Sequence, residues 1–352
     1  MKTSKSILFL DKVFLKRKRE SLRGVELFNL NLIRDLLRLG YPVRVTADRS
    51  WRGALLEFAA PYRPEFVSLP ALGWEFMNGA AAAILLSCQR CDTLLLGNVG
   101  NGIILLVSWL KRIRVFSRCV LIAHREASAR FVRQFAVLPG HVVCVNEKIA
   151  EPFRKAGYRG VHVDYGIFGA DRFQPRERAD AGVVNFCVLG MLDNAWKGAD
   201  TAVEAFRLMP EAIRNKCVLQ LASFTSPPDY SEKNIVAHDW MPSDSIPEWL
   251  RGMDVMLCPS RDEEVMRETF SQAVVQGMLT ALPVIASDRQ IFVEKLEQGG
   301  GYIFRNAQEL SQCMQQLAVD PALREELGRK GRQTALERYV WDTERFAQRY
   351  ID

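Results

Sequence analysis

The sequence predicts an α/β protein: two doubly wound domains that face each other across a cleft, followed by a C-terminal amphipathic helix. Short apolar runs typical of buried strands alternate with helical patterns along the chain, and a polar stretch interrupts them near the middle. The chain has 352 residues, which suits two domains of about 150 residues each. Its composition, 48% apolar and 25% charged, is that of a globular protein and excludes disordered, collagen-like and disulfide-dense classes.

The first domain is predicted over residues 1–167. Its expected strands are unbroken apolar runs, as in parallel sheets that are covered on both faces. These runs occupy residues 6–11, 43–48, 65–70, 92–97, 119–124 and 141–146. After the first run comes a glycine-containing loop and an amphipathic helix, whose apolar side is expected to carry Leu27, Leu30, Ile33, Leu36 and Leu37.

The second domain is predicted over residues 183–335 and repeats the same pattern. Its expected strands occupy residues 185–190, 218–223, 234–239, 254–260, 283–287 and 301–304. A linker is predicted over residues 168–182, where the sequence is polar, contains Pro175 and loses its periodicity. Residues 336–352 are predicted to form an amphipathic helix that packs on any remaining apolar groove, including back on the first domain.

The net charge of +6 is mild, so it permits nucleic acid, anionic lipid or phosphorylated ligands without choosing among them. Most of the eight cysteines lie in apolar runs, where we interpret them as small core residues in a reducing compartment. The first apolar run is only four residues long and lacks a small-residue cleavage site, so we expect a strand there and not a signal peptide. The longest apolar stretches fall short of the ~20 residues that cross a bilayer, and no membrane span is expected.

Ligands of open parallel sheets bind beyond the carboxyl ends of the strands, so residues in those places are the first candidates. His124 ends a predicted strand, and a histidine there can donate a hydrogen bond or move a proton. Gly24 lies in the loop after the first strand, where a glycine lets a phosphate approach backbone amides, although a plain loop glycine is the alternative. The glycine-rich residues 97–102 lack the order of a dinucleotide-binding motif and are interpreted as a turn.

No metal site is expected. His141, His162 and His238 have no partner at metal-ligand spacing, and Cys88 and Cys91 form a single Cys-x-x-Cys pair without a second one. The chain also contains no Asp-x-Asp triplet, the common way of holding a divalent cation against a nucleotide diphosphate. A bound diphosphate is therefore expected to be neutralised by backbone amides and cationic side chains.

Residues 254–290 carry most of the functional signal. A buried strand and an acidic loop come first, and Glu268 then precedes a helix that begins near Phe270. The backbone amides of Phe270 and Ser271 would lie in the first helical turn, where unpaired N–H groups attract an anion. Lys197 follows the first strand of the second domain, within expected reach of that anion. Taken singly, Lys197 is a solvated cation and Glu268 a capping carboxylate.

Taken together, these residues and their order resemble the retaining glycosyltransferases of the GT-B fold, specifically the large family 4, glycosyl transferases group 1. The second domain of that family carries a lysine-glycine pair after its first strand, as Lys197 and Gly198 do here. It also carries two glutamates separated by seven residues before a Pro-Val-Ile-Ala sequence, and Glu268 matches the first of them. The resemblance extends to residues 24–46, 144–158, 166–175 and 339–346.

The resemblance implies a role for each matching position of the second domain. Glu268 is expected to accept hydrogen bonds from hydroxyls of the donor sugar, and Lys197 to neutralise the leaving group. The amides of Phe270 and Ser271 are expected to face the diphosphate. Thr269 belongs to the same donor-binding segment.

In the first domain, Gly24 is similar to the family's loop glycine near the donor phosphates, and His124 to a cleft histidine that contacts the sugar or nearby backbone.

Three positions depart from the pattern. Met191 stands where an arginine commonly accompanies the lysine. Gln276 replaces the second glutamate, which binds the ribose hydroxyls, and a neutral acceptor binds more weakly than a charged one. Phe168 replaces an asparagine, so that position implies nothing.

The resemblance implies a retaining hexosyltransferase that needs no metal and no cofactor besides its co-substrate. It would move a sugar from a nucleotide-diphosphate donor to a glycan or lipid-linked acceptor in cell-envelope polysaccharide or lipopolysaccharide synthesis. Because Met191 and Gln276 replace family residues, the alternative is a non-catalytic GT-B subunit that binds a nucleotide sugar or a partner protein. Nucleic acid is not an expected partner, because no recognised binding module accompanies the basic residues.

The acceptor side is expected to lie in the first domain. Basic residues gather in residues 12–23, and residues 109–118 interleave aromatic and aliphatic side chains with basic ones. Such interleaving suits an anionic membrane surface or a phosphorylated lipid acceptor, although a solvated face on a basic protein is the alternative. We therefore expect a cytoplasmic protein that attaches peripherally to the inner face of the cytoplasmic membrane.

Overall fold

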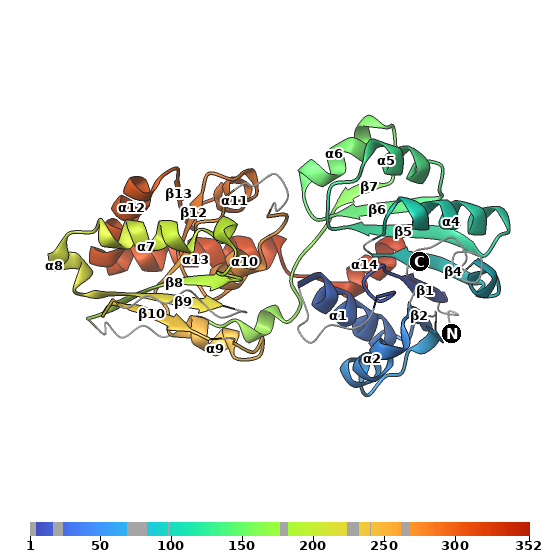
Figure 1. Ribbon diagram of the computed structural model, residues 1–352, viewed down its shortest axis with the longest axis horizontal. Coiled ribbons are helices and arrows are strands. Elements are labelled where there is room, and N and C mark those ends of the chain that lie inside the picture. The colour runs from blue at the N-terminus through green and yellow to red at the C-terminus, as the bar shows by residue number, and fades with distance from the viewer. Residues whose placement is uncertain are drawn as a thin grey trace. The chain divides into compact units, whose positions relative to one another are not determined.

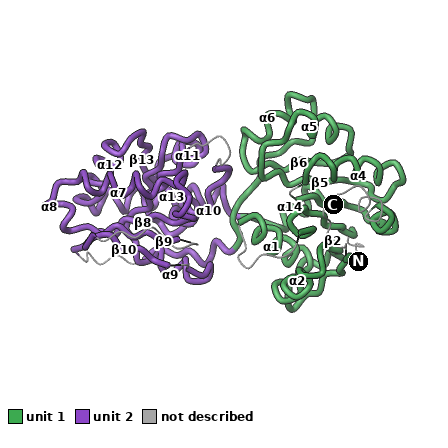
Figure 2. Tube along the Cα trace, in the orientation of Figure 1, with its two compact units in different colours: residues 1–168, 341–352 green, residues 169–340 purple. Residues whose placement is uncertain are grey.

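The computed structural model of the chain describes residues 5–16, 24–68, 83–97, 99–176, 182–223, 232–239, 241–261 and 268–352. It divides into two compact units (Figure 2). Unit 1 comprises residues 1–168 and 341–352, and unit 2 comprises residues 169–340. The chain thus leaves unit 1 after Phe168 and returns to it after Val340.

Unit 1 contains a seven-stranded parallel sheet with the order β3-β2-β1-β4-β5-β6-β7 (Figure 1). Six strands confirm the predicted apolar runs, and their residues are mostly buried, as expected for a sheet covered on both faces. The seventh, β7, was not predicted, because it is a short edge strand with partly exposed side chains. The strands are β1 Ile7–Leu10, β2 Val43–Ala47, β3 Glu65–Ser68, β4 Cys91–Leu96, β5 Phe116–Ala123, β6 Gly140–Cys144 and β7 Val161–Val163.

The helices of unit 1 form two groups, one in which α1 contacts α2 and α14, and one in which α5 contacts α4 and α6 (Figure 1). Ser128 and Asn146 begin α5 and α6 by accepting hydrogen bonds from the amides of Phe131 and Ile149. The helices are α1 Gly24–Arg38, α2 Arg52–Ala59 after the 3-10 turn η1 Arg49–Trp51, α4 Asn101–Arg112, α5 Ala129–Phe135, α6 Glu147–Lys155 and α14 Thr343–Tyr350.

The buried face of α1 differs in part from the predicted one. Leu30, Ile33 and Leu36 are buried as predicted, but Leu27 and Leu37 are only half-buried. The buried face turns instead toward Phe28 and Leu32, and it also takes in Glu26 and Asn29. The prediction from apolar periodicity missed this face because two of its buried residues are polar.

The C-terminal helix is shorter than predicted, and it belongs to unit 1. Helix α13 ends at Arg338 and α14 begins at Thr343, so the two helices are separated around Trp341. The carboxylate of Asp342 accepts a hydrogen bond from the Arg345 amide and fixes the new start. Tyr350, at the end of α14, is fully buried within unit 1.

Unit 2 contains a six-stranded parallel sheet with the order β10-β9-β8-β11-β12-β13, and all six strands confirm predicted runs. The strands are β8 Val184–Gly190, β9 Cys217–Ser223, β10 Ile235–His238, β11 Val255–Cys258, β12 Val284–Ser287 and β13 Gly301–Phe304. The helices are α7 Ala199–Arg207, α8 Glu211–Arg214, α9 Ile246–Arg251, α10 Gln272–Leu279, α11 Gln290–Leu296, α12 Ala307–Val319 and α13 Pro321–Arg338. Two 3-10 turns complete it, η2 Ala170–Arg172 and η3 Ala195–Lys197.

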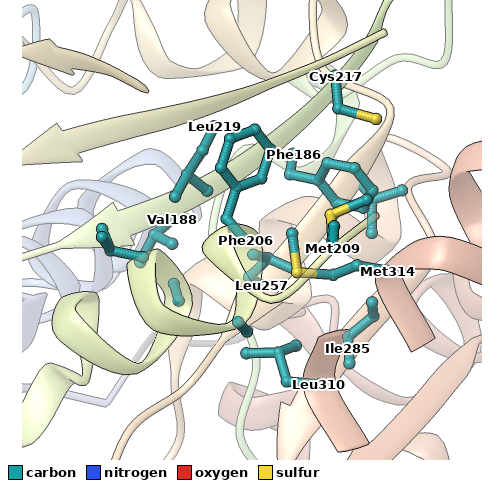
Figure 3. Packing of buried hydrophobic residues seen from close by; sticks show 14 of the residues in the cluster. Phe186, Val188, Phe206, Met209, Cys217, Leu219, Leu257, Ile285, Leu310 and Met314 are labelled. Atoms are coloured by element: carbon teal, nitrogen blue, oxygen red, sulfur yellow. The ribbon is translucent and has the colours of Figure 1, made fainter. Parts of the chain in front are cut away.

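A tightly packed apolar core supports the sheet of unit 2 (Figure 3). Phe186 on β8 and Leu257 on β11 meet Phe206 of α7 and Met314 of α12 in this core, and each is at most 1% exposed. Burying such side chains stabilises the unit by roughly 1.5–3 kcal/mol each. All eight cysteines are free, and only Cys88 is exposed.

Candidate functional site

Two of the predicted site residues of unit 2, Lys197 and Ser271, line a small pocket at the carboxyl ends of β8 and β11, the edge at which parallel sheets bind ligands. The side chains that line the pocket include Leu189, Lys197, Ser260, Ser271 and Ala273. A larger pocket in unit 1, between α2 and β3, is lined by Arg52 and five uncharged residues. No predicted site residue lines that second pocket.

Lys197 and Glu268 form an ion pair at the small pocket. The Nζ atom of Lys197 lies 2.6 Å from Oε2 of Glu268, and the two side chains are only 15% and 13% exposed. The same lysine nitrogen lies 4.4 Å from the centre of the Trp196 ring. Ser260 places its Oγ 3.5 Å from the same carboxylate oxygen. The fold therefore brings a cation and a carboxylate together from the loops that follow two neighbouring strands.

Gly198 fixes the approach of the Lys197 loop to β11. Its φ of 71° lies in the left-handed region that favours glycine. A Cβ atom at this position would lie 2.0 Å from the carbonyl oxygen of Pro259. Only glycine fits at position 198, next to the end of β11. Its place in the chain directly after Lys197 holds the lysine close to that strand end.

The N-terminal end of α10 faces the pocket. Ser271 precedes the helix with a φ of 57° and makes no capping hydrogen bond through its side chain. The first N–H groups of a helix have no intrahelical partner and carry its positive dipole end, which makes them an anion site. Phe270 is only 6% exposed, and its ring packs against that of Tyr339 with centroids 6.0 Å apart. Thr269 links Phe270 to Glu268.

Lys295 is a residue near the site that the sequence analysis missed. It lies on α11 and is only 5% exposed. Its Nζ lies 4.6 Å from the centre of the Phe270 ring and 5.1 Å from that of Tyr339. The spacing of residues could have revealed its burial. Lys295 follows Phe292 by three residues and Ile291 by four, and residues at this spacing share one face of a helix.

His124 follows β5 in unit 1 and is buried among aromatic rings. The ring lies 5.4 Å from those of Phe28 and Tyr165, measured between centroids. Burial lowers the pKa of His124 to about 3, with a smaller effect from Arg125, so the imidazole is neutral at pH 7. Its Nε2 atom has no hydrogen-bond partner among the described residues. The position is therefore suited to a neutral hydrogen-bonding group.

Gly24 begins α1 and is exposed, and the loop before it lies outside the described residues. A buried polar pair lies nearby in sequence, where Asn29 Nδ2 donates to Asp11 Oδ2 over 2.6 Å. A Cβ at Gly97 would lie 2.0 Å from the same Asp11 oxygen. This first glycine of residues 97–102 therefore leaves room for the Asp11 side chain. Sequence analysis did not find the Asp11–Asn29 pair.

The remaining histidines lie apart from the pocket. His141 and His162 contact each other, with Nδ1 and Nε2 3.2 Å apart, and burial lowers the pKa of both. His238 Nε2 contacts Gln220 Oε1 at 2.7 Å. Over the part of the chain that the structure describes, no three His, Cys, Asp or Glu side chains are grouped as metal ligands.

Comparison with known proteins gives the fold a name. Residues 184–320 match the family model of glycosyl transferases group 1. The Anabaena protein HepE in complex with UDP is similar to this chain over 98% of both chains, with 17% identity and a TM-score of 0.73. This chain has the GT-B fold.

Two further GT-B structures resemble the chain over almost their whole length. A glycosyltransferase from Rickettsia africae has 13% identity and a TM-score of 0.75, with 98% of both chains covered. WaaG, a glycosyltransferase involved in lipopolysaccharide biosynthesis, has 14% identity and a TM-score of 0.64, with 98% of this chain and 99% of WaaG covered. No curated protein sequence matches this one.

Two substituted positions of this GT-B chain lie beside the pocket residues. Met191 directly follows β8, and its carbonyl oxygen accepts hydrogen bonds from the Asn194 amide and side chain at the turn that leads to Lys197. Gln276 lies three residues after Ala273 on α10 and is half-buried. It therefore shares a face of the helix with a residue that lines the pocket.

Proposed function

We propose that this protein is a retaining glycosyltransferase that moves a sugar from a nucleotide-diphosphate donor to a glycan or lipid-linked acceptor. The observation that carries the proposal is the Lys197–Glu268 ion pair beside the N-terminal end of α10. It unites a cation, the N-terminal end of a helix and a hydrogen-bond acceptor at the sheet edge where ligands bind. The match of residues 184–320 to glycosyl transferases group 1 supports the same function.

The proposed roles follow from the charges that develop as the donor bond breaks. The sugar gains oxocarbenium character while the nucleotide diphosphate leaves with its negative charge. The ammonium of Lys197 and the amides of Phe270 and Ser271, which directly precede α10 at Gln272, stabilise that leaving group. Glu268 accepts hydrogen bonds from donor-sugar hydroxyls, and Gln276 accepts from the nucleoside through its amide carbonyl.

The residues of unit 1 complete the proposed assignment. Gly24, at the start of α1, leaves space for the donor phosphates next to the backbone. His124 contacts the sugar or nearby backbone as a neutral ring, because its lowered pKa leaves it without a proton to give as an acid at pH 7. No side chain is assigned as a covalent nucleophile.

The chemistry is proposed to need no metal ion. Lys197 and the helix amides neutralise the diphosphate in the place of a divalent cation. EDTA should then leave the transfer rate unchanged, and a rate that depends strictly on manganese would contradict this part of the proposal.

We place the reaction in cell-envelope glycan synthesis, on the cytoplasmic face of the membrane. Leu105, Trp109 and Ile113 follow one another at helical spacing on or just after α4, and each is at least 40% exposed. Lys111 and Arg112 are exposed beside them. An apolar stripe with adjacent cations suits the surface of an anionic bilayer. In the described parts of the chain, no helix is long and apolar enough to span a membrane. The similar protein WaaG acts in lipopolysaccharide biosynthesis.

The decisive experiment measures turnover of UDP-, GDP- and ADP-sugars with a membrane lipid extract as acceptor. UDP-sugars come first, because the similar protein HepE binds UDP. Lys197→Met and Glu268→Gln should each lower the rate by about 100-fold or more, as expected when a transition-state charge loses its partner. Lys216→Met, at an exposed lysine of the same unit, is the matched control and should keep full activity. Unchanged activity in both site variants would reject the assignment.

The alternative is a GT-B subunit that binds a nucleotide sugar or a partner protein without catalysis. The observations that favour it are Met191 and Gln276. Relative to the family pattern, Met191 removes the positive charge of an arginine and Gln276 removes the negative charge of a glutamate. The same assay separates the two functions, because a binding subunit shows neither transfer nor slow donor hydrolysis although it retains nucleotide binding.

A further inference from the structure

The buried lysine of α11 has no role in the function proposed above. Lys295 is 5% exposed, although the exclusion of an ammonium group from water is strongly unfavourable without compensation. A methionine of similar length would fill the same space without that penalty. The retention of a charged group in the interior of unit 2 therefore calls for an electrostatic explanation.

The immediate contacts of Lys295 leave its charge uncancelled. The ammonium lies against the rings of Phe270 and Tyr339, at 4.6 Å and 5.1 Å from their centres. Ring faces attract a cation but carry no net charge. Among the described residues, no carboxylate forms an ion pair with this nitrogen. Glu294 and Glu268 act on it at longer range and favour its charged form.

The charge of the pocket shows what this cation adds. Lys197 and Glu268 neutralise each other, because their charged atoms are 2.6 Å apart. A second buried cation among the described residues contacts this segment: the Nζ of Lys295 lies against the ring of Phe270, the residue before Ser271. With Lys295 protonated, the three side chains carry a net charge of +1, and without it they carry none. Charges in a shielded interior interact strongly.

We propose that Lys295 is a buried cation of the donor site, which supplies the net positive charge that selects the diphosphate part of the donor. Its ammonium contacts the ring of Phe270 and acts on the donor by a longer-range electrostatic interaction. It does not touch the donor, unlike the groups assigned above. The inference rests on the proposed function, because it concerns the ligand of the same pocket.

The charge of Lys295 changes within an accessible pH range. Burial lowers the pKa of Lys295 to about 8, and the two glutamates oppose that effect only in part. The groups that face it are Glu294 on its own helix, Glu268 before α10 and Tyr339 after α13, with Arg338 and Glu297 beside the tyrosine. The positive charge is thus present at pH 7 and lost above pH 8.

The test compares UDP with uridine by calorimetry, on the full chain, at pH 7.0 and pH 8.5. UDP keeps nearly the same charge over this range, since the second phosphate pKa is about 6 and the uracil ring loses its proton only at higher pH. Lys295→Met should weaken UDP binding about tenfold at pH 7.0, as expected for the loss of a partly shielded unit charge, and should leave uridine binding unchanged. Lys295→Arg keeps the charge and should keep the wild-type affinity. The wild-type protein should bind UDP about threefold more weakly at pH 8.5 than at pH 7.0, because most of its Lys295 is then deprotonated, whereas Lys295→Met should not change with pH.

Each outcome has a distinct meaning. Equal weakening of UDP and uridine in Lys295→Met would show a packing role and overturn the inference, and so would wild-type UDP affinity in that variant. Thermal unfolding and hydrogen exchange of α10 confirm that the variants are folded. Absence of binding by the wild-type protein to UDP, GDP and ADP alike would instead reject the proposed function itself.

Discussion

At the scale of single residues, the site depends on backbone positions that only particular side chains tolerate. Gly198 combines a left-handed φ with contact to the Pro259 carbonyl. Ser271 holds a φ of 57° without the freedom of glycine. Gly198 follows Lys197, and Ser271 precedes α10. Residues in left-handed backbone conformation are therefore found at the pocket itself.

Substitution of Gly198 by alanine should destabilise unit 2 and displace Lys197. We expect a loss of about 3 kcal/mol in the free energy of unfolding, because a left-handed residue costs about 1 kcal/mol and the overlap with Pro259 adds to it. Gly182→Ala is the control, because Gly182 has a φ of 70° but nothing within 4 Å of a Cβ atom. Urea denaturation measures both. Equal losses in the two variants would show that the contact with Pro259 does not matter.

Lys295 should leave a signature in the pH dependence of stability. The folded-state pKa of Lys295 is about 8, below the unfolded value of 10.5, so the unfolded chain binds more protons between these values. The free energy of unfolding should therefore rise with pH across this window by about 3 kcal/mol relative to Lys295→Met, at 1.36 kcal/mol per pKa unit. Chemical denaturation between pH 7 and 11 measures the difference. A constant difference between wild type and variant would contradict the burial of the charge.

Individual site residues differed in how far the sequence revealed them. Lys197 and Glu268 stand in recognisable motifs, and the pair they form was within reach of prediction because both follow parallel strands. The roles assigned to them stay predictions. Lys295 and the Asp11–Asn29 pair escaped notice, since a polar residue on a buried face gives no apolar periodicity. The aromatic surroundings of His124 come from distant segments and required the fold.

At the scale of elements, the strands were the most predictable part of the molecule. Apolar runs predicted every strand except β7, and most of these strands are buried on both faces, although the edge strands β3 and β10 are largely not. The edge strand β7 has only three residues, and Val163 is 39% exposed, so it lacked this signal. Helix ends were less predictable, because they depend on caps such as Asp342 before α14.

Helix α4 should bind anionic membranes through its exposed apolar side. Leu105→Ser should lower the fraction of protein that floats with phosphatidylglycerol vesicles at low salt, and Trp109→Ser should lower it further, because each exchange removes apolar surface from the contact. Leu336→Ser is the matched control, because Leu336 is 48% exposed against 51% for Leu105 but lies on α13. Flotation unaffected by the α4 variants, or absent in the wild type, would contradict this surface.

At the scale of the whole molecule, two units are built from similar parts but differ in continuity. Unit 2 is one continuous segment, whereas unit 1 is closed by residues 341–352. The Trp341 amide donates to the Ile167 carbonyl over 3.0 Å, and Arg345 forms an ion pair with Asp164, also 3.0 Å apart. Length and alternating pattern predicted two α/β units, but only the fold shows which contacts the last segment makes.

Removal of residues 341–352 should destabilise unit 1 and leave unit 2 intact. The deletion exposes the surfaces that cover Phe346, Tyr350 and Ile351, each at most 1% exposed, and should cost several kcal/mol, at roughly 1.5–3 kcal/mol per side chain. Calorimetry should show an earlier transition assigned to unit 1, and hydrogen exchange should increase in β5 and β6 while β8 and β11 stay protected. Equal loss of protection in both units would show that they unfold together.

The return of the chain to unit 1 also has a consequence for biosynthesis. Domains generally fold in order as they leave the ribosome. Here the earliest-made unit receives its last helix only after all 172 residues of unit 2, from Gly169 to Val340, have been translated. Unit 2 therefore completes its chain before unit 1 does. Until α14 is made, the surface of unit 1 that α14 covers stays exposed to solvent and accessible to chaperones.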